Sequence, residues 1–134
     1  MKQLFILFIF TFAVLNAHET PDKMRGMHSL ASYHECDLEA LLDTRALKEA
    51  FLTAIEASGA HTLSYVEHVF DEGGYTLVAL LAENHATLHT YPNLKSCFID
   101  FFACDTECNA KLFHHTLIEY LTPGLANQNL IERN

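Results

Sequence analysis

The stretch of sequence that decides the fold reads Glu83-Asn84-His85-Ala86-Thr87-Leu88-His89-Thr90-Tyr91-Pro92. Residues from Thr87 to Tyr91 include two threonines and a tyrosine, which favour a strand. Pro92 ends this strand, because proline has no amide hydrogen to donate to a sheet. The same stretch carries a carboxylate and two histidines, which suit proton transfer near neutral pH.

Further strands and two helices are predicted on both sides of this stretch. Strands are expected at residues 27–36, 61–70, 75–83 and 96–104, with a hairpin turn at 71–74. One helix is expected from an N-cap at Asp43 to about Ser58, with a buried apolar stripe and Gly59 at its end. A second is expected over 107–121. This order predicts an α+β fold, a two-layer sandwich with a mainly antiparallel sheet and two helices on one face.

The 134 residues are enough for one domain and too few for two. The predicted division of the chain is a signal peptide at 1–17, a linker at 18–26, the domain at 27–122 and a C-terminal tail at 123–134.

The N-terminal residues resemble a secretory signal peptide. Lys2 precedes an apolar run over residues 4–15, and cleavage is expected after Ala17. The run is too short for a stable membrane span, which needs about 20 apolar residues. The protein is therefore expected to be secreted or periplasmic, with an uncleaved N-terminal anchor as an alternative. A chain that starts at Met24 or Met27 would instead be cytoplasmic.

The net charge and the cysteines limit the possible partners and binding sites. The net charge of −9 argues against nucleic-acid binding, which needs a basic surface. If the chain is exported, its four cysteines can form disulfides, and three pairings of Cys36, Cys97, Cys104 and Cys108 remain open. No metal site is expected, because His85 and His89 lie ~13 Å apart along a strand.

Several separated segments carry a resemblance to a known family. They are 28–31, 36–37, 73–78, 83–92 and 98–104. In this register the chain resembles the bacterial-type S-adenosylmethionine decarboxylase proenzymes. The resemblance implies pyruvoyl-dependent decarboxylation of S-adenosylmethionine in spermidine biosynthesis. In that family the pyruvoyl cofactor forms from a serine that follows a glutamate, when the chain cleaves itself between the two.

Asn84 occupies the position of that serine, after Glu83. Self-cleavage requires a hydroxyl or thiol that attacks the preceding carbonyl, and an asparagine side chain has neither. The resemblance implies catalytic roles for His89 as the base, for Thr76 as a processing hydroxyl, and for Cys104 as the acid that protonates the product carbanion. No cofactor is expected, because pyruvoyl cannot form at Asn84.

The resemblance also implies a substrate site. Phe70 and Tyr91 match aromatic residues that stack on the adenine. Asn93 stands where the family commonly has a glutamate that accepts both ribose hydroxyls, and one amide oxygen cannot replace that pair. Each of these residues also has a structural interpretation. Glu83 and His89 can be polar strand ends, the aromatic residues can belong to a core, and Cys104 can be a small buried residue or half of a disulfide.

Three functions follow from this comparison. The expected one is a pseudoenzyme, a decarboxylase-like binding or regulatory protein that does not process itself. The alternatives are an active decarboxylase in which Asn84 is a mutation or sequence error, and a repurposed enzyme without pyruvoyl. The expected partners are a small molecule like S-adenosylmethionine and, because helices cover only one sheet face, a second copy or a related subunit.

Overall fold

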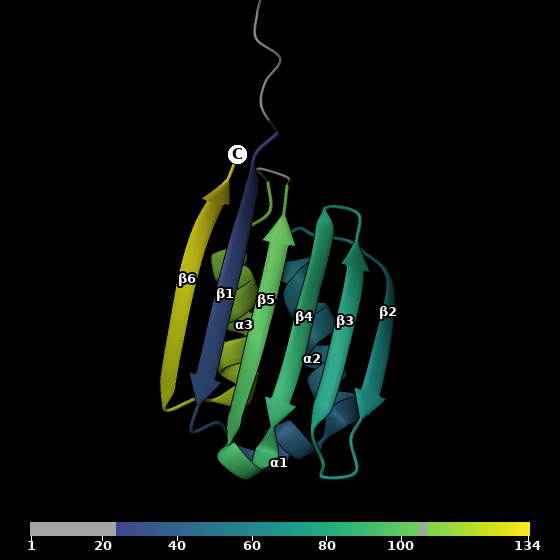
Figure 1. The fold of residues 1–134 in the computed structure, drawn as a ribbon, viewed down its shortest axis with the longest axis vertical. Helices are drawn as coiled ribbons and strands as arrows, with labels where there is room; N and C mark the ends of the chain where they lie inside the picture. Colours follow the sequence, from purple (N-terminus) through teal and green to yellow (C-terminus); the bar gives the residue numbers. More distant parts are fainter. Residues whose placement is uncertain (1–23, 105–106) are drawn as a thin grey trace, which may run out of the picture.

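The computed structural model describes residues 24–104 and 107–134. Six strands form one antiparallel sheet in the order β2-β3-β4-β5-β1-β6, and helices cover one of its faces (Figure 1). The elements are β1 (Gly26–His34), α1 (Leu38–Leu42), α2 (Thr44–Ala57), β2 (Thr62–Val69), β3 (Tyr75–Leu81), β4 (Asn84–Tyr91), the 3₁₀ turn η1 (Pro92–Leu94), β5 (Ser96–Ala103), α3 (Ala110–Leu121) and β6 (Leu125–Arg133). The predicted two-layer α+β class is confirmed.

Helix α2 forms where the apolar spacing predicts it. Asp43 caps its N-terminus, because the Asp43 side chain accepts a hydrogen bond from the amide of Ala46 at 3.0 Å. Gly59 follows the helix with a φ of +88°, a conformation that glycine adopts without steric cost. The buried stripe consists of Leu47, Phe51, Ala54 and Ile55.

Helix α3 joins the other helix to the sheet through aromatic packing. It begins later than predicted, because Asn109 is its N-cap and accepts a hydrogen bond from the amide of Lys111 at 3.0 Å. The ring of Phe113 stacks on Phe101 of β5 with centroids 4.6 Å apart, and meets Phe51 of α2 edge-on at 5.7 Å. Burying each of these rings contributes roughly 1.5–3 kcal/mol.

The two faces of the sheet differ in burial, because side chains alternate along each strand. The helix-covered face contains Tyr75, Leu77, Ala79, Leu81, Ala86, Leu88, Ile99, Phe101 and Ala103, all buried. We call the other side the open face. It carries His28, Leu30, Thr76, Val78, Leu80, His85, Thr87, His89, Phe98, Asp100 and Phe102, all more accessible. The polar and titratable side chains of the central strands therefore gather on the open face.

The predicted C-terminal tail is wrong, because residues 125–133 form the edge strand β6. This strand pairs with β1 along its length, from Gly26 opposite Arg133 to His34 opposite Leu125. All residues of β6 are exposed, and their sequence lacks the alternation of apolar and polar residues that indicates a half-buried strand. The domain therefore continues beyond its predicted end at residue 122.

Two other boundaries also differ from the prediction. The sequence pattern did not predict the short helix α1, which Asp37 caps by accepting a hydrogen bond from Ala40 at 2.8 Å. Strand β4 begins at Asn84 rather than Thr87, because Asn84 already pairs with Leu81 across a tight turn. The whole of the decisive stretch after Glu83 is therefore part of the sheet or of η1.

No disulfide joins the four cysteines, all of which are among the described residues. Cys36 and Cys97 are buried, whereas Cys104 and Cys108 are partly accessible. A hydrogen bond with Cys36 and burial raise the pKa of Cys97. Disulfide pairing in an oxidising compartment stays a prediction.

Within the described part of the chain, no helix is both long and apolar enough to cross a membrane. The predicted signal peptide at 1–17 lies outside the described residues. Export of the protein therefore stays a prediction as well.

A buried histidine links α3 to the sheet. The Nε2 atom of His114 lies 2.6 Å from the Ser29 hydroxyl, and its Nδ1 atom lies 2.6 Å from the Tyr33 hydroxyl. A neutral imidazole can donate at one nitrogen and accept at the other, so these hydroxyls satisfy both. Burial lowers the pKa of His114 to about 4. The fold therefore holds this histidine in its neutral form.

This burial predicts a pH-dependent stability. Between pH 6.5 and about 4 the unfolded chain binds a proton at His114 that the folded chain does not, so stability falls as the pH drops through this window. The expected loss is about 3 kcal/mol. Urea unfolding at pH 7, 5.5 and 4 measures it. His114→Gln should be less stable at pH 7 and lose less on acidification, whereas parallel losses in both chains would contradict the assignment.

Candidate functional site

The predicted site residues form two groups at opposite ends of β4 (Figure 1). The first lines a pocket of about 890 Å³ and consists of Phe70, Thr76, His89, Tyr91 and Asn93. The second lies where β4 begins and β5 ends, and consists of Glu83, Asn84 and Cys104. The structure therefore places the predicted site residues in two separate groups, and their functional roles stay predictions.

The pocket group contains a hydroxyl–imidazole pair between two aromatic side chains. Thr76 and His89 are directly opposite in β3 and β4, with Thr76 Oγ1 3.0 Å from His89 Nδ1. This contact fixes the orientation of the imidazole ring and leaves Nε2 for another partner. Phe70 and Tyr91 are 50% and 47% exposed, so their rings are available for stacking on a flat ligand.

Two turns shape this pocket. In the turn after β2, the Phe70 amide donates to the Gly74 carbonyl at 2.7 Å, and Gly73 has a φ of +85°. After β4, Pro92 opens η1 and its carbonyl accepts a hydrogen bond from the amide of Lys95 at 2.9 Å. Both turns contain residues that fix or permit the required backbone angles, so the pocket walls follow from local sequence.

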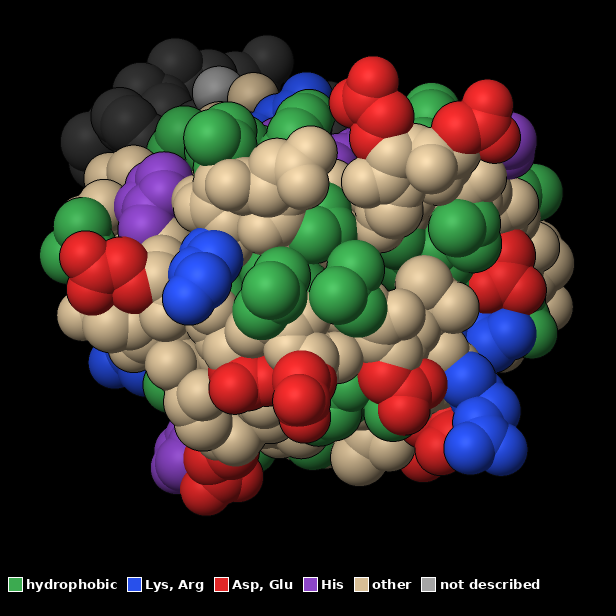
Figure 2. All heavy atoms as spheres, turned by 90° about the horizontal axis from the view of Figure 1, so that it is seen from below, with side chains coloured by type: hydrophobic (Ala, Val, Ile, Leu, Met, Phe, Trp, Pro, Cys, Tyr) green, Lys and Arg blue, Asp and Glu red, His purple; other side chains and the backbone are tan. Residues whose placement is uncertain are grey.

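The rim of the pocket is acidic. Asp71 and Glu72 line it together with Asn93 and Leu94. Figure 2 views the molecule from this end and shows acidic side chains grouped beside exposed apolar ones. Such a surface favours a ligand that combines positive charge with apolar or aromatic parts.

Asn84 stands in an unusual backbone conformation at the other end of β4. Its φ of +149° lies in a region that favours glycine, and other residues adopt it at roughly 1–3 kcal/mol. The side-chain amide of Asn84 donates to the sulfur of Cys104, with Nδ2 2.9 Å from Sγ. The amide nitrogen therefore occupies the space beside the thiol.

Glu83 is held by its neighbours through both backbone and side chain. Its carbonyl, which belongs to the peptide bond before Asn84, accepts a hydrogen bond from the Cys104 amide at 3.1 Å. Its carboxylate accepts from the His61 amide at 2.9 Å and lies 2.8 Å from His61 Nδ1. Burial opposes ionisation, but the hydrogen bonds from His61 outweigh it and hold the pKa of Glu83 below its usual range. The carboxylate is therefore charged and fixed in place.

The two groups are too far apart to act together within one chain. His89 pairs with Phe98, and Asn84 pairs with Ala103, across β4 and β5. Cys104 follows Ala103, so it lies roughly 20 Å further along β5 than the partner of His89. The predicted base and the predicted acid thus belong to different half-sites. We call them the pocket half-site and the Asn84 half-site.

Two structural features near these residues were not predicted from the sequence. His61, the partner of the Glu83 carboxylate, is far away in the chain and belongs to no motif. His28, His85 and Asp100 form a cluster on the open face, although no metal site was expected from spacing within one strand. Both features arise from strand pairing, which places distant residues side by side.

Comparison with known proteins gives a consistent result. Residues 27–134 match the sequence model of the S-adenosylmethionine decarboxylase family. The S-adenosylmethionine decarboxylase proenzyme of Synechococcus sp. strain WH7803 is 36% identical over 81 residues, which are 60% of this chain and 63% of that protein. The S-adenosylmethionine decarboxylase proenzyme 2 of Bacillus anthracis is 31% identical over 99 residues, 74% of this chain and 80% of that protein.

A solved structure agrees with these sequence matches. The adenosylmethionine decarboxylase from Aquifex aeolicus VF5 has a TM-score of 0.76 and 26% sequence identity, covering 84% of this chain and 92% of its own. The likeness therefore extends from the decisive stretch to almost the whole described domain. The chain belongs to the S-adenosylmethionine decarboxylase family.

Proposed function

We propose that this protein is a family member that does not process itself, and that it acts as a binding or regulatory subunit instead of a pyruvoyl enzyme. One observation carries the proposal. The residue after Glu83 is Asn84, whose amide nitrogen donates a hydrogen bond to Cys104. Self-cleavage needs a nucleophilic oxygen or sulfur there, and an amide nitrogen is a poor nucleophile.

The surroundings of Asn84 remain suited to cleavage, which favours a second candidate. The Glu83 carbonyl accepts a hydrogen bond from the Cys104 amide, and such a donor stabilises the oxyanion that forms when a carbonyl is attacked. The strained φ of Asn84 also falls at this peptide bond. An active decarboxylase in which Asn84 is a mutation or sequence error is therefore the alternative. A repurposed enzyme using His89 and Cys104 would need both half-sites in one place.

A second copy would bring the half-sites together. The two half-sites lie at opposite ends of β4, so twofold stacking of two sheets in opposite directions would set the pocket half-site of one chain against the Asn84 half-site of the other. Exposed apolar side chains, including Val66, Val78, Leu80 and Phe98, favour such packing. A related subunit with a serine at this position would receive His89 and Thr76 from this chain, which gives the pseudoenzyme a regulatory role.

The proposed ligand is a molecule like S-adenosylmethionine. The half-exposed rings of Phe70 and Tyr91 and the acidic rim of the pocket suit an adenine next to a sulfonium. Asn93 lines the same pocket but offers a single acceptor oxygen for the ribose. Binding is therefore expected to be weaker than with a glutamate at this position.

Placing a serine hydroxyl at residue 84 tests whether Asn84 prevents self-cleavage. Asn84→Ser should be cut between residues 83 and 84 on a denaturing gel, because the Glu83 carbonyl remains in place and a second copy supplies Thr76 and His89. Asn127→Ser is the matched control, since it makes the same change on the exposed edge strand β6, outside both half-sites. No cleavage of the Asn84→Ser chain would contradict the view that Asn84 alone blocks processing.

A mixing experiment tests whether the half-sites meet between chains. The double variant Asn84→Ser/His89→Ala should stay intact alone, but be cleaved when co-expressed with the wild-type chain, which supplies His89. Tags of different size identify the chain that is cut. If the double variant remains intact beside the wild-type chain while Asn84→Ser is cleaved, His89 acts within its own chain or the chains do not pair.

Calorimetry tests the ligand. Asn93→Glu should bind S-adenosylmethionine roughly 10-fold more tightly than the wild-type chain, because two carboxylate oxygens accept both ribose hydroxyls. Asn127→Glu on β6 adds the same charge outside the pocket and should leave the affinity unchanged. Absence of binding to both the wild-type chain and Asn93→Glu would rule out this ligand.

A further inference from the structure

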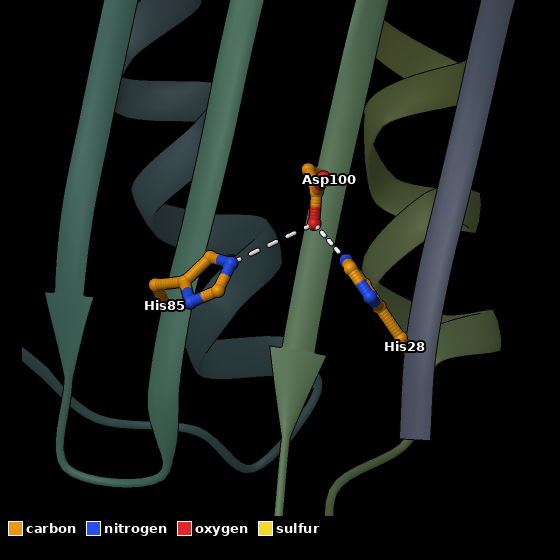
Figure 3. A group of neighbouring side chains, drawn as sticks. All are labelled: His28, His85 and Asp100. Carbon is orange, nitrogen blue, oxygen red and sulfur yellow. Dashed lines mark hydrogen bonds and ion pairs between the residues drawn. The ribbon is translucent and has the colours of Figure 1, made fainter. Parts of the chain in front are cut away.

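A cluster of potential metal ligands lies on the open face, between the two half-sites. His28 of β1, His85 of β4 and Asp100 of β5 offer ligand atoms that all lie within 4.8 Å of one another. Figure 3 shows both imidazole rings turned toward the Asp100 carboxylate from the two strands that flank it. We propose that these three side chains bind one divalent transition-metal ion.

Strand register explains why these residues meet. His28 and His85 both pair with Phe102, from opposite sides of β5. Neighbouring strands are 4.7–4.9 Å apart, so long side chains on the two outer strands can reach the middle one. The ring of Phe102 contacts both imidazoles, at centroid distances of 5.2 Å and 5.7 Å, and Asp100 is the next open-face position along β5. Strand pairing therefore brings His28, His85 and Asp100 together on the open face.

The donor atoms indicate the class of metal. His28 Nε2 is hydrogen-bonded to Asp100 Oδ1, and His85 Nε2 lies 3.7 Å from the same oxygen. Two imidazole nitrogens and one carboxylate suit Zn²⁺, Co²⁺, Ni²⁺ or Cu²⁺. Ca²⁺ and Mg²⁺ prefer sites made of oxygen ligands alone. The cluster therefore fits a transition metal.

The distances between the three ligand atoms are close to those around a tetrahedral metal ion. Bonds of ~2.0–2.1 Å in tetrahedral geometry place ligand atoms ~3.3 Å apart. The His28–Asp100 contact would open slightly and His85 would move inward, which side-chain rotation can supply. The side chains of His28, His85 and Asp100 are 20%, 41% and 30% exposed, so the outward side is open to water. Three protein ligands and an open position are typical of an ion that exchanges its fourth ligand.

One nearby charge opposes metal binding. The guanidinium of Arg133 lies over the Phe102 ring, 4.5 Å from its centroid, and so stands near the cluster. Its positive charge repels a cation, and Arg133→Gln should therefore tighten metal binding. A cluster held only by hydrogen bonds and ion pairs predicts no such gain. The inference does not depend on self-processing or on S-adenosylmethionine binding, although the proposed second copy would cover the same face.

Zinc titration of the full chain tests the site. After removal of bound metals with a chelator, calorimetry should find one strong Zn²⁺ site per chain. His28→Gln and His85→Gln should each weaken it at least ~10-fold. Co²⁺ should give visible absorption bands with the wild-type chain that both variants lose. Circular dichroism checks that each variant is folded, and the wild-type Co²⁺ spectrum tests the site even if one variant does not fold.

The control uses another histidine–carboxylate pair. His115 Nδ1 lies 3.7 Å from Glu119 on the exposed surface of α3, so His115→Gln removes a comparable histidine outside the cluster. It should leave Zn²⁺ affinity unchanged. Equal Zn²⁺ affinity in the wild-type, His28→Gln and His85→Gln chains would overturn the proposal. So would the absence of Zn²⁺ binding to the wild-type chain.

Discussion

The packing of α2 and α3 on one face of the sheet is the constraint on which the rest of the structure depends. Phe113 joins the layers, because it stacks on Phe101 of the sheet and contacts Phe51 of α2. Alternation along the strands then sends every second side chain to the open face. The pocket residues Thr76 and His89 and the proposed metal ligands are therefore found on the side that the helices leave uncovered.

The secondary structure could be predicted from the sequence where apolar residues recur at regular spacing. The central strands and α2 could be predicted, because their apolar positions recur with the period of a strand or a helix. β6 could not, since all its side chains are exposed and its pairing with β1 depends on the backbone. The contact of His61 with Glu83 and the meeting of His28 with Asp100 depend on strand register, which local sequence does not specify.

The surroundings of Asn84 bear on the proposed loss of self-cleavage. Around it the Glu83 carbonyl still accepts a hydrogen bond from the Cys104 amide, and Thr76 still contacts His89 at the other end of the sheet. Asn84 itself donates to the Cys104 sulfur, so it fits its surroundings as a polar residue without supplying a nucleophile. This combination supports the proposal of a protein that has the family fold but does not form a pyruvoyl cofactor at residue 84.

Intact-mass spectrometry of the purified wild-type protein tests this account most directly. It predicts one uncut chain, with the mass of the full sequence or of a chain trimmed near Ala17. Two fragments that separate between Glu83 and Asn84, with a blocked N-terminus on the fragment that starts at residue 84, would contradict it. That result would mean that the chain forms an electrophilic cofactor despite its asparagine.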